Sequence, residues 1–473
     1  MPIIGNLWCL GSKTHESFTK LAEQLGGRFK LFLGAKEVVV LSSASAVREI
    51  LLHPNCNFSS RPPFNSFSLP PGGPNLTFEP YGKKYLFLRK TGLDALKLAY
   101  CPFAKKLPET QEAHDQEEEN TTEVLTELVA KRQVSNLIDN IEADGLMTSS
   151  EKSVRWMVIS SACQLFTGRE LQGHLLAEKA EQFLSDMNKF VHVIPFATLA
   201  DTNPWLHYLF WPKIRELKSL FQRMSDFVLV LATESEPNSI FGQLASRSLA
   251  HDLPDNISRM ELLSIGTQLF GAMIPTTSST IEWVILFLTN RPDLQSKVRE
   301  ELTKQADINL KSRSSNVYLN AVVYETLRFI TVTPITVPHA PLEDFKEEGV
   351  FIPKETPVLV NLWAANHDKN VWKYPEVFDT RNFLKTVKEN DTETDRVMLD
   401  HEAVENLMSF GVGKRRCLGE KLALSLIYLI LADILKSFSL HPIKRDGRIS
   451  EEQLIRLDVV PNDFAAYLRK EKK

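Results

Sequence analysis

The sequence predicts a mainly α-helical protein with a small β-rich lobe, an α+β fold. Glycine is sparse, with 20 residues among 473, which favours long helices over many tight turns. Apolar residues follow helical spacing through most of the middle of the chain, whereas short β-prone segments occur near its start and in its last third. No stretch of biased composition separates these parts, so we expect one domain over residues 1–473. Its β-rich lobe would cover about 27–60 and 334–384, and its helical lobe about 81–330 and 417–440.

Composition and charge exclude several other classes of protein. Hydrophobic residues make up 43% and charged residues 24%, as in a soluble globular protein. Lys and Arg number 55 against 59 Asp and Glu, and this net charge of −4 argues against nucleic acid as a partner. No segment reaches the roughly 18 uninterrupted apolar residues needed to cross a membrane. The five cysteines lack C-x-x-C spacing, which predicts reduced thiols in a cytosol-facing protein.

The first hundred residues are expected to mix strands and helix. The apolar segments Phe29–Leu33 and Val38–Leu41 flank Gly34 and predict a β-hairpin. A short helix is expected at Ala44–Leu52. Residues 61–80 are rich in Pro and Gly and predict an irregular loop of about twenty residues. Such a loop is either functional or a disordered surface segment, and the sequence leaves both interpretations open.

Further helices and strands follow from spacing. Residues 109–120 are strongly acidic and predict a solvated surface. Glu151–Phe166 and Pro212–Thr233 show the apolar spacing of helices. Gly349–Pro353 and Thr356–Asn361 are apolar, are bordered by Pro and charged residues, and predict strands.

A long helix is expected to begin at Ser258. Ser258 and Glu261 fit a capping box, and the helical pattern then runs to Leu288, a length of about 45 Å. Pro275 lies in its middle, where it removes a backbone donor and crowds the carbonyl of Gly271. We therefore expect a kink or bulge at this point.

The carbonyl freed by Pro275 needs a hydrogen-bond partner, which Thr276, Thr277 or a water molecule could supply. Two interpretations are open. The segment is either a kinked core helix whose hydroxyls satisfy its own backbone, or a groove against which a ligand is pressed.

A second helix, Asn320–Phe329, carries an ion pair. Glu325 and Arg328 are three residues apart and share one face. Their neighbours are apolar, which predicts that the pair is buried, where losing one partner costs about 3–5 kcal/mol. A structural role is expected.

The most informative stretch of the chain is 410–419. Two glycines and three cations precede Cys417, and Lys421–Phe438 after it reads as a long apolar helix. The thiol therefore lies at a helix N-terminus, which predicts a lowered pKa. Such a thiolate is a nucleophile or a single metal ligand. Zinc would need three more N or S ligands, which the neighbouring sequence lacks, whereas haem iron needs only one.

This stretch is similar to the haem-binding signature of the cytochrome P450 family. The five signature positions are Phe410, Gly413, Arg415, Cys417 and Gly419. Other segments resemble landmarks of the same family in the same order along the chain: 2–7, Tyr85 with Arg89, 270–280, Glu325 with Arg328, Pro338 with His339, and 351–354. Several of these resemble the microsomal branch, which oxidises drugs, steroids and fatty acids. The resemblance implies a P450-like single domain with the long kinked helix lying over the haem.

The resemblance also implies roles for individual residues. Cys417 would ligate the iron of haem b, with Phe410 packed near the sulfur. The haem propionates would be held by charge-assisted bonds from Arg89, His339 and Arg415, and Tyr85 would add a hydrogen bond. Thr276 would manage protons on bound dioxygen. The loop 61–80, the helices around 176–230 and the chain near Ile335 would line the substrate pocket.

The implied activity is insertion of one oxygen atom from O2 into an apolar substrate. Electrons would come from NADPH through a flavoprotein reductase, with cytochrome b5 as a further donor. Lys414 and Arg416 could dock an acidic reductase, or could simply be solubilising surface cations. The implied location is the cytosolic face of the endoplasmic reticulum membrane. The microsomal branch has an N-terminal membrane helix before its Pro-rich start, and the present sequence begins where that linker would end.

Two segments of the sequence depart from the family pattern. The long helix has Pro275 where the family usually has an acid, and Met273 where it has glycine. Because proton delivery needs a relay, this change leaves two alternatives open: a haem-thiolate isomerase or dehydratase acting on peroxides without a reductase, and a non-catalytic haem or ligand carrier. The family also often places Arg at the position of Asn382, so either Asn382 or its neighbour Arg381 would complete the Glu325–Arg328 pair.

Overall fold

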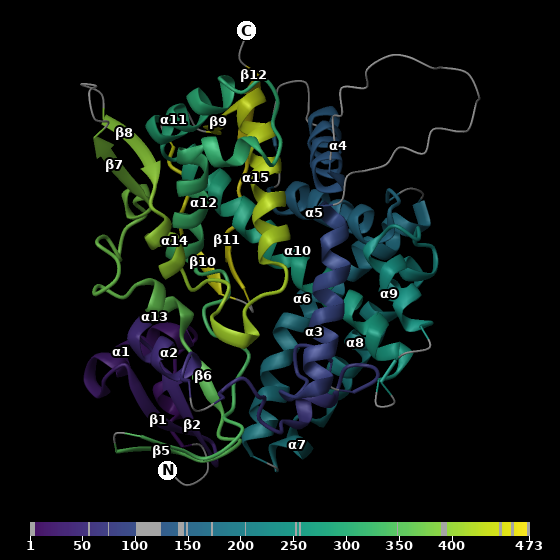
Figure 1. Ribbon diagram of the computed structural model, residues 1–473, viewed down its shortest axis with the longest axis vertical. Coiled ribbons are helices and arrows are strands. Elements are labelled where there is room, and N and C mark those ends of the chain that lie inside the picture. Colours follow the sequence, from purple (N-terminus) through teal and green to yellow (C-terminus); the bar gives the residue numbers. More distant parts are fainter. Residues whose placement is uncertain are drawn as a thin grey trace.

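The computed structural model describes residues 5–470 apart from a set of gaps. The gaps are 55–56, 74, 101–123, 141–145, 148–149, 172–173, 204, 251–252, 255–256, 348, 389–394, 444–446 and 456–457. The acidic segment 109–120 lies outside the described residues. Over the described residues the protein is mainly helical with several small sheets, as predicted (Figure 1).

The helices are α1 Thr14–Leu25, α2 Ala44–Leu51, α3 Lys83–Leu96, α4 Leu125–Asn140, α5 Ser150–Thr167, α6 His174–Thr202, α7 Leu206–Leu209, α8 Trp211–Thr233, α9 Ile240–Ser248, α10 Arg259–Thr289, α11 Pro292–Thr303, α12 Val317–Ile330, α13 Leu362–Asn366, α14 His401–Asn406 and α15 Glu420–Ser437. The strands are β1 Arg28–Leu33, β2 Lys36–Leu41, β3 Leu146–Met147, β4 Phe345–Glu347, β5 Val350–Ile352, β6 Val358–Val360, β7 Leu384–Lys388, β8 Asp395–Leu399, β9 Phe438–Pro442, β10 Gln453–Ile455, β11 Val459–Pro461 and β12 Ala466–Lys470.

The β-rich lobe is built around the predicted hairpin. β1 and β2 pair antiparallel, with Phe29 opposite Val40, and Gly34 has the positive φ of +61° that its turn requires. β6 joins β2 in parallel, and β4 pairs antiparallel with β5. Figure 1 shows this lobe at the lower left, beneath α1 and α2.

Three further sheets were not predicted from the sequence. β7 pairs with β8, β10 with β11, and β12 lies between β3 and β9. Each of these strands has five residues or fewer. A period-2 signal over so few residues is too short to separate a strand from a loop.

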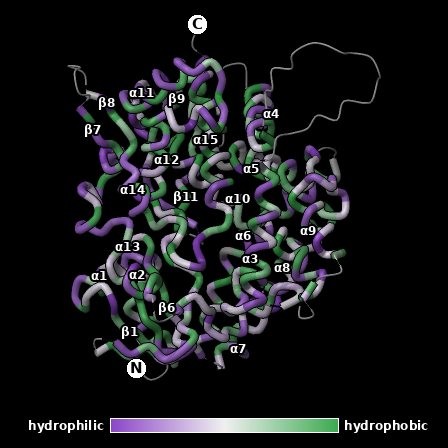
Figure 2. Tube along the Cα trace, viewed as in Figure 1, coloured by the Kyte–Doolittle hydropathy of each residue, from purple (hydrophilic) through white to green (hydrophobic). Residues whose placement is uncertain are grey.

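Helix α10 crosses the middle of the molecule and forms the centre of the core. From Thr277 to Thr289 every residue is buried. Figure 2 shows apolar segments in the interior and hydrophilic ones along the outer turns. Among the described residues α10 is the one helix long and apolar enough by composition to span a membrane. Because 72% of its most apolar stretch is buried inside the protein, it serves here as a core helix.

Both capping and proline predictions for this helix can be compared with the structure. The predicted capping box is present. The Ser258 hydroxyl accepts from the N–H of Glu261 at 3.2 Å, and the Glu261 carboxylate accepts from the N–H of Ser258 at 2.8 Å. Pro275 lies inside α10, which is α-helical from Arg259 to Thr289, so the proline does not end the helix, and the predicted kink stays a prediction. The hydroxyl of Thr276 donates to the carbonyl of Ala272 at 2.8 Å, not to that of Gly271.

Helix α12 carries a buried ion pair. Arg328 donates from Nε and Nη2 to the two carboxylate oxygens of Glu325, at 2.8 and 2.7 Å, and both side chains are fully buried. Asn382 donates its amide to the same carboxylate at 3.2 and 3.3 Å. Arg381 does not join them: its side chain is largely exposed and pairs with Asp379. Burial raises the pKa of Glu325, and the Arg328 guanidinium opposes that rise.

We expect Arg328→Ala to lower the free energy of unfolding by about 3–5 kcal/mol, because it leaves the Glu325 carboxylate buried without its counter-charge. Urea denaturation of the purified protein measures this change. Arg381→Ala is the matched control and should leave the denaturation midpoint where it is, since Arg381 lies on the surface. Equal effects of the two substitutions would contradict the assignment.

A half-buried carboxylate, Glu301 of α11, predicts a pH dependence of stability. Glu301 accepts from the N–H groups of Val317 at 3.0 Å and Tyr318 at 2.8 Å, at the start of α12, and burial raises its pKa to about 7. Its contribution to folding is therefore complete below the ordinary pKa of 4.5 and is lost as the pH rises through about 7. In Glu301→Gln the stability difference between pH 5 and pH 8 should shrink; an unchanged difference in urea titrations would argue against this carboxyl as its source.

Candidate active site

The loop that carries Cys417 is shaped by its glycines. Gly411 and Gly413 both have φ of +71°, the left-handed region where a side chain would be strained. A Cβ on Gly413 would also lie 3.1 Å from the carbonyl oxygen of Leu51. The N–H of Cys417 then donates to the carbonyl of Phe410 at 2.9 Å and closes the loop. Gly419 is the N-cap of α15, so the thiol lies at the start of this buried helix, as predicted.

The side chain of Cys417 keeps surface exposed to solvent, while protein atoms crowd around its sulfur. Burial raises the pKa of the thiol, while the N–H groups of Gly419 and Glu420 and the charge of Arg89 oppose that rise. The predicted lowering of this pKa is therefore wrong for the protein alone, because desolvation outweighs the helix donors.

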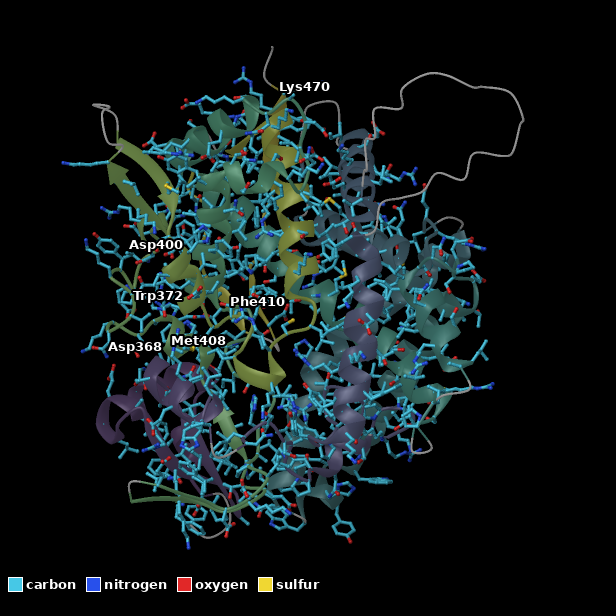
Figure 3. The ribbon with its side chains drawn as sticks, viewed as in Figure 1. Asp368, Trp372, Asp400, Met408, Phe410 and Lys470 are labelled. Atoms are coloured by element: carbon cyan, nitrogen blue, oxygen red, sulfur yellow. The ribbon has the colours of Figure 1, made fainter. Side chains whose placement is uncertain are left out.

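The start of this loop is fixed to α12 and α13. Asn366 accepts from the N–H of Met408 at 2.9 Å and donates to the hydroxyl of Ser409, also at 2.9 Å. Ser409 in turn donates to the carbonyl of Leu327 at 2.7 Å. Figure 3 places Met408 and Phe410 near the centre of the molecule, close to the start of α15. The ring of Phe410 is partly buried against the main hydrophobic core.

Helix α3 brings Tyr85 and Arg89 to the same loop. The Tyr85 hydroxyl donates to the carbonyl of Lys414 at 2.9 Å, and Arg89 donates to the carbonyl of Arg416 at 2.8 Å. The guanidinium of Arg415 lies over the ring of Tyr85 at 3.6 Å and donates to the carbonyl of Ser59 at 2.7 Å. Tyr85, Arg89 and Arg415, which the resemblance implies as haem-binding residues, thus lie together.

Two more cationic or basic groups face this cluster. Arg61 is buried and donates to the carbonyls of Thr77 and Pro338, at 2.9 and 2.8 Å. Burial, and then the charge of Arg415, lower its pKa to about 9. His339 is buried beside them and bonded to the carbonyl of Phe58, and burial and Arg61 lower its pKa to about 3.

Arg61 was not named from the sequence. Its signal is its position directly before Pro62 and Pro63 at the start of the loop 61–80, a place that gives no indication of burial. That loop is also not the disordered surface segment that one interpretation offered. Phe64 and Leu76 within it are buried, and Phe67 stacks on Phe78 with 4.5 Å between ring centroids.

This set of groups fits a particular kind of cofactor. Among the residues that the structure describes, no three His, Cys, Asp or Glu side chains are placed to hold a metal ion. Cys417 can therefore supply one ligand, and the remaining ligands must come with the metal. Burial lowers the pKa of both Arg61 and Arg415, and a neighbouring cation lowers each further, Arg415 for Arg61 and Arg89 for Arg415, so an anion beside these guanidiniums would be stabilised. A metal chelate that carries carboxylates, such as haem, meets both requirements. The fold and site thus define a haem-thiolate class of protein.

Comparison with known proteins agrees with this class. The family model described as Cytochrome P450 matches residues 1–462. Cytochrome P450 1A1 of Platichthys flesus is 30% identical over 94% of this chain and 84% of its own length, and cytochrome P450 1A2 of Mus musculus is 30% identical over 93% and 85%. A zebra fish cytochrome P450 solved with progesterone superposes with a TM-score of 0.77 at 23% identity, covering 97% of this chain and all of that one.

The chain belongs to the cytochrome P450 family. It is accordingly a haem-dependent monooxygenase with the mainly helical fold of that family, as the resemblance implied. The comparisons favour neither the peroxide isomerase nor the non-catalytic carrier.

Arg61 should contribute to haem retention together with Arg415. We expect Arg61→Leu to lose haem about tenfold faster than the unaltered protein, the effect of removing one charge-assisted bond. Transfer of haem to excess apomyoglobin, followed by absorbance, measures this rate. Arg61→Lys keeps the charge and should lose haem more slowly than Arg61→Leu. Lys414→Ala, an exposed cation of the same loop, should behave as the unaltered protein.

Proposed function

We propose that Cys417 is the iron ligand of the haem and that the loop 410–419 exists to present it. The observation that carries this proposal is one exposed thiol at the start of α15, which accepts from the backbone N–H groups of Gly419 and Glu420. These donors favour the thiolate over the thiol, and bound iron would add the larger favourable charge. A side chain on Gly419 would meet only the sulfur of Cys417, at 4.0 Å, so glycine at this position leaves room for a flat cofactor beside the thiol.

The basic cluster would hold the haem propionates. Arg61, Arg89 and Arg415 would donate charge-assisted bonds, and Tyr85 and His339 would add neutral ones. Their present partners are mostly backbone carbonyls, which are weaker acceptors than a carboxylate. The cluster is thus pre-arranged for an anion at little cost in reorganisation.

Haem bound through a thiolate supplies the activation of dioxygen for insertion of one oxygen atom into a substrate. The residues of the chain would then handle protons and exclude water. The hydroxyl of Thr276, partly exposed, holds its proton towards the carbonyl of Ala272, and Thr280 donates to the carbonyl of Thr276 at 2.8 Å. Pro275 offers no carboxyl at the usual position, so we infer that protons pass through Thr276 and water.

The electrons would come from NADPH through a flavoprotein reductase, with cytochrome b5 as a further donor. Of the two cations considered for docking, Lys414 is exposed and lies over the ring of Tyr81 at 5.2 Å. Arg416 is also exposed, but it pairs with Glu420 through two bonds of 2.6 Å. We therefore assign the larger share of an acidic partner's attraction to Lys414.

The substrate would be a small apolar molecule such as a steroid, a fatty acid or a xenobiotic. Its pocket would be bounded by the loop 61–80, by α6 and α8, and by the chain near Ile335. We also propose that the chain works as one domain, at the cytosolic face of the endoplasmic reticulum membrane, and that nucleic acid is not a partner. The apolar substrate class agrees with a membrane location, because such molecules concentrate in lipid.

The absorption spectrum of the reduced, carbon-monoxide-treated protein tests the ligand assignment. The unaltered protein should give the band typical of thiolate-ligated haem, and Cys417→Ala should lack it because no other cysteine lies in this loop. Cys163→Ala, a buried cysteine on α5, is the control and should keep the band. A Cys417→Ala spectrum identical to that of the unaltered protein would overturn the proposal.

Pro275→Asp tests how protons are supplied. If relay through Thr276 and water limits turnover, the new carboxyl should raise the fraction of NADPH oxidation that yields product, by up to the 100-fold or so ascribed to one acid–base group. Parallel measurement of NADPH, hydrogen peroxide and product gives this fraction. Pro275→Ala, which restores the backbone donor without a carboxyl, is the matched control and should show no gain.

A further inference from the structure

Lys84, in the first turn of α3, joins two carboxylates that come from other parts of the chain. Its Nζ lies 2.5 Å from Oε1 of Glu261, at the start of α10, and 3.2 Å from Oε2 of Glu79, near the end of the loop 61–80. The three side chains are mostly buried, with 24% of Lys84, 12% of Glu79 and 14% of Glu261 exposed. This cluster therefore differs from an ordinary surface ion pair, which water screens.

The position of Lys84 is unfavourable for its own helix. Lys83 and Lys84 both lie in the first turn of α3, where the positive end of the helix dipole disfavours a cation. The helix is held by close packing on α10, since a side chain on Gly92 would come within 3.1 Å of Ile265. A mostly buried cation at this point therefore calls for a role besides the stability of α3.

Glu261 fixes the position of the Lys84 ammonium group. The second oxygen of the Glu261 carboxylate, Oε2, accepts from the N–H and the hydroxyl of Ser258, both at 2.8 Å. Both oxygens of this carboxylate are thus engaged, and the side chain cannot turn without breaking the capping box of α10. Glu261 is therefore the fixed partner of Lys84.

Glu79, the other partner of Lys84, also contacts the basic cluster beside the cysteine loop. Arg415 donates from Nη2 to the backbone carbonyl of Glu79 at 2.5 Å. A change of rotamer in Glu79 therefore suffices to bring its carboxylate from Lys84 towards the Arg415 guanidinium. Burial raises the pKa of Glu79, and the charges of Lys84 and Arg415 oppose that rise, so both cations act on this carboxylate.

Arg415 is bonded in a way that leaves it attractive to an anion. It donates to the carbonyls of Ser59 at 2.7 Å, Leu76 at 3.3 Å and Glu79 at 2.5 Å. A carboxylate is a stronger acceptor for a guanidinium than a neutral carbonyl. The Glu79 carboxylate would therefore compete with any carboxylate of a ligand that binds to Arg415.

We propose that Lys84 is a positioning residue, which holds the Glu79 carboxylate away from Arg415 and so keeps this guanidinium open to a propionate of the haem. This inference rests on the proposed role of Arg415 in binding haem. Without Lys84, the Glu79 carboxylate pairs with Arg415, because an ionised group in this half-buried place needs an opposite charge. The acid of the protein then displaces the acid of the cofactor, and haem is held less tightly.

The rate of haem transfer to excess apomyoglobin tests this competition. Lys84→Met should lose haem about tenfold faster than the unaltered protein, the effect of losing one charge-assisted bond. Lys84→Arg keeps the charge and should lose haem as slowly as the unaltered protein. Lys83→Met, the same change at an exposed neighbour in the same turn, is the matched control and should have no effect. An unaltered rate in Lys84→Met would overturn the proposal.

Removing the competitor separates positioning from a merely structural role. Glu79→Gln cannot pair with Arg415 as an anion and should lose haem no faster than the unaltered protein. The double variant Lys84→Met with Glu79→Gln should match Glu79→Gln within about twofold, because Lys84 then has no carboxylate to restrain. If the double variant loses haem as fast as Lys84→Met, Lys84 acts through the fold of α3 and the proposal is wrong.

A crystal structure of Lys84→Met tests the contact independently of the rate. The Glu79 carboxylate should lie within about 3 Å of the Arg415 guanidinium. If Arg415→Leu loses haem no faster than the unaltered protein, the proposed role of Arg415 fails, and the crystal structure alone still decides whether Lys84 restrains Glu79. A Glu79 carboxylate that remains apart from Arg415 in that structure would overturn the inference.

Discussion

The buried pairing of Glu325 with Arg328 is the interaction on which the rest of the site depends. Removing two charges from water is costly, and the cost is met only when every remaining donor finds an acceptor. Arg328 meets this condition: besides Glu325 it donates to the carbonyls of Asn366, Pro375 and Val377, at 2.9–3.0 Å. One guanidinium thereby joins α12 to the end of α13 and to the irregular segment after it. No apolar side chain could supply this directional cross-link.

The cross-link extends to the loop that carries Cys417 through Asn366. The carbonyl of Asn366 accepts from Arg328, and its side chain holds Met408 and Ser409 at the start of the cysteine loop. The far end of that loop is fixed by α15, whose buried apolar face packs in the main core. Cys417 is thus held between a polar network on one side and a hydrophobic helix on the other. This explains how an irregular loop can place one sulfur accurately.

The two charged clusters of the interior differ in balance. Around Glu325, each charge has its partner within the protein. Around Arg61 and Arg415 the bonded partners are backbone carbonyls, and Glu79, a carboxylate whose charge acts on Arg415, forms its ion pair with Lys84 at 3.2 Å. A balanced cluster stabilises the fold, whereas an unbalanced one is suited to a negatively charged ligand. The balance of positive and negative charge therefore distinguishes the structural cluster around Glu325 from the candidate binding cluster around Arg61 and Arg415.

The local elements of the fold followed from short-range rules. The hairpin around Gly34, the capping box at Ser258 and the helix after Cys417 were predicted because each depends on residues within a few positions of one another. The glycines and cations of the loop 410–419 indicated a thiolate site for the same reason, and their resemblance to a known signature named the family.

The tertiary structure decided which distant segments of the chain come into contact. The sequence left Arg381 and Asn382 as alternatives, and only the packing of residues 374–382 against α12 shows that Asn382 reaches Glu325. Arg61 and Arg415 are 354 positions apart (415 − 61), so no spacing rule could join them. The pKa of Cys417 was expected to be low because the helix N-terminus is visible in sequence, but desolvation depends on everything that surrounds the sulfur in space. Sequence thus determines which groups are present and their local geometry, and the fold determines which of them meet.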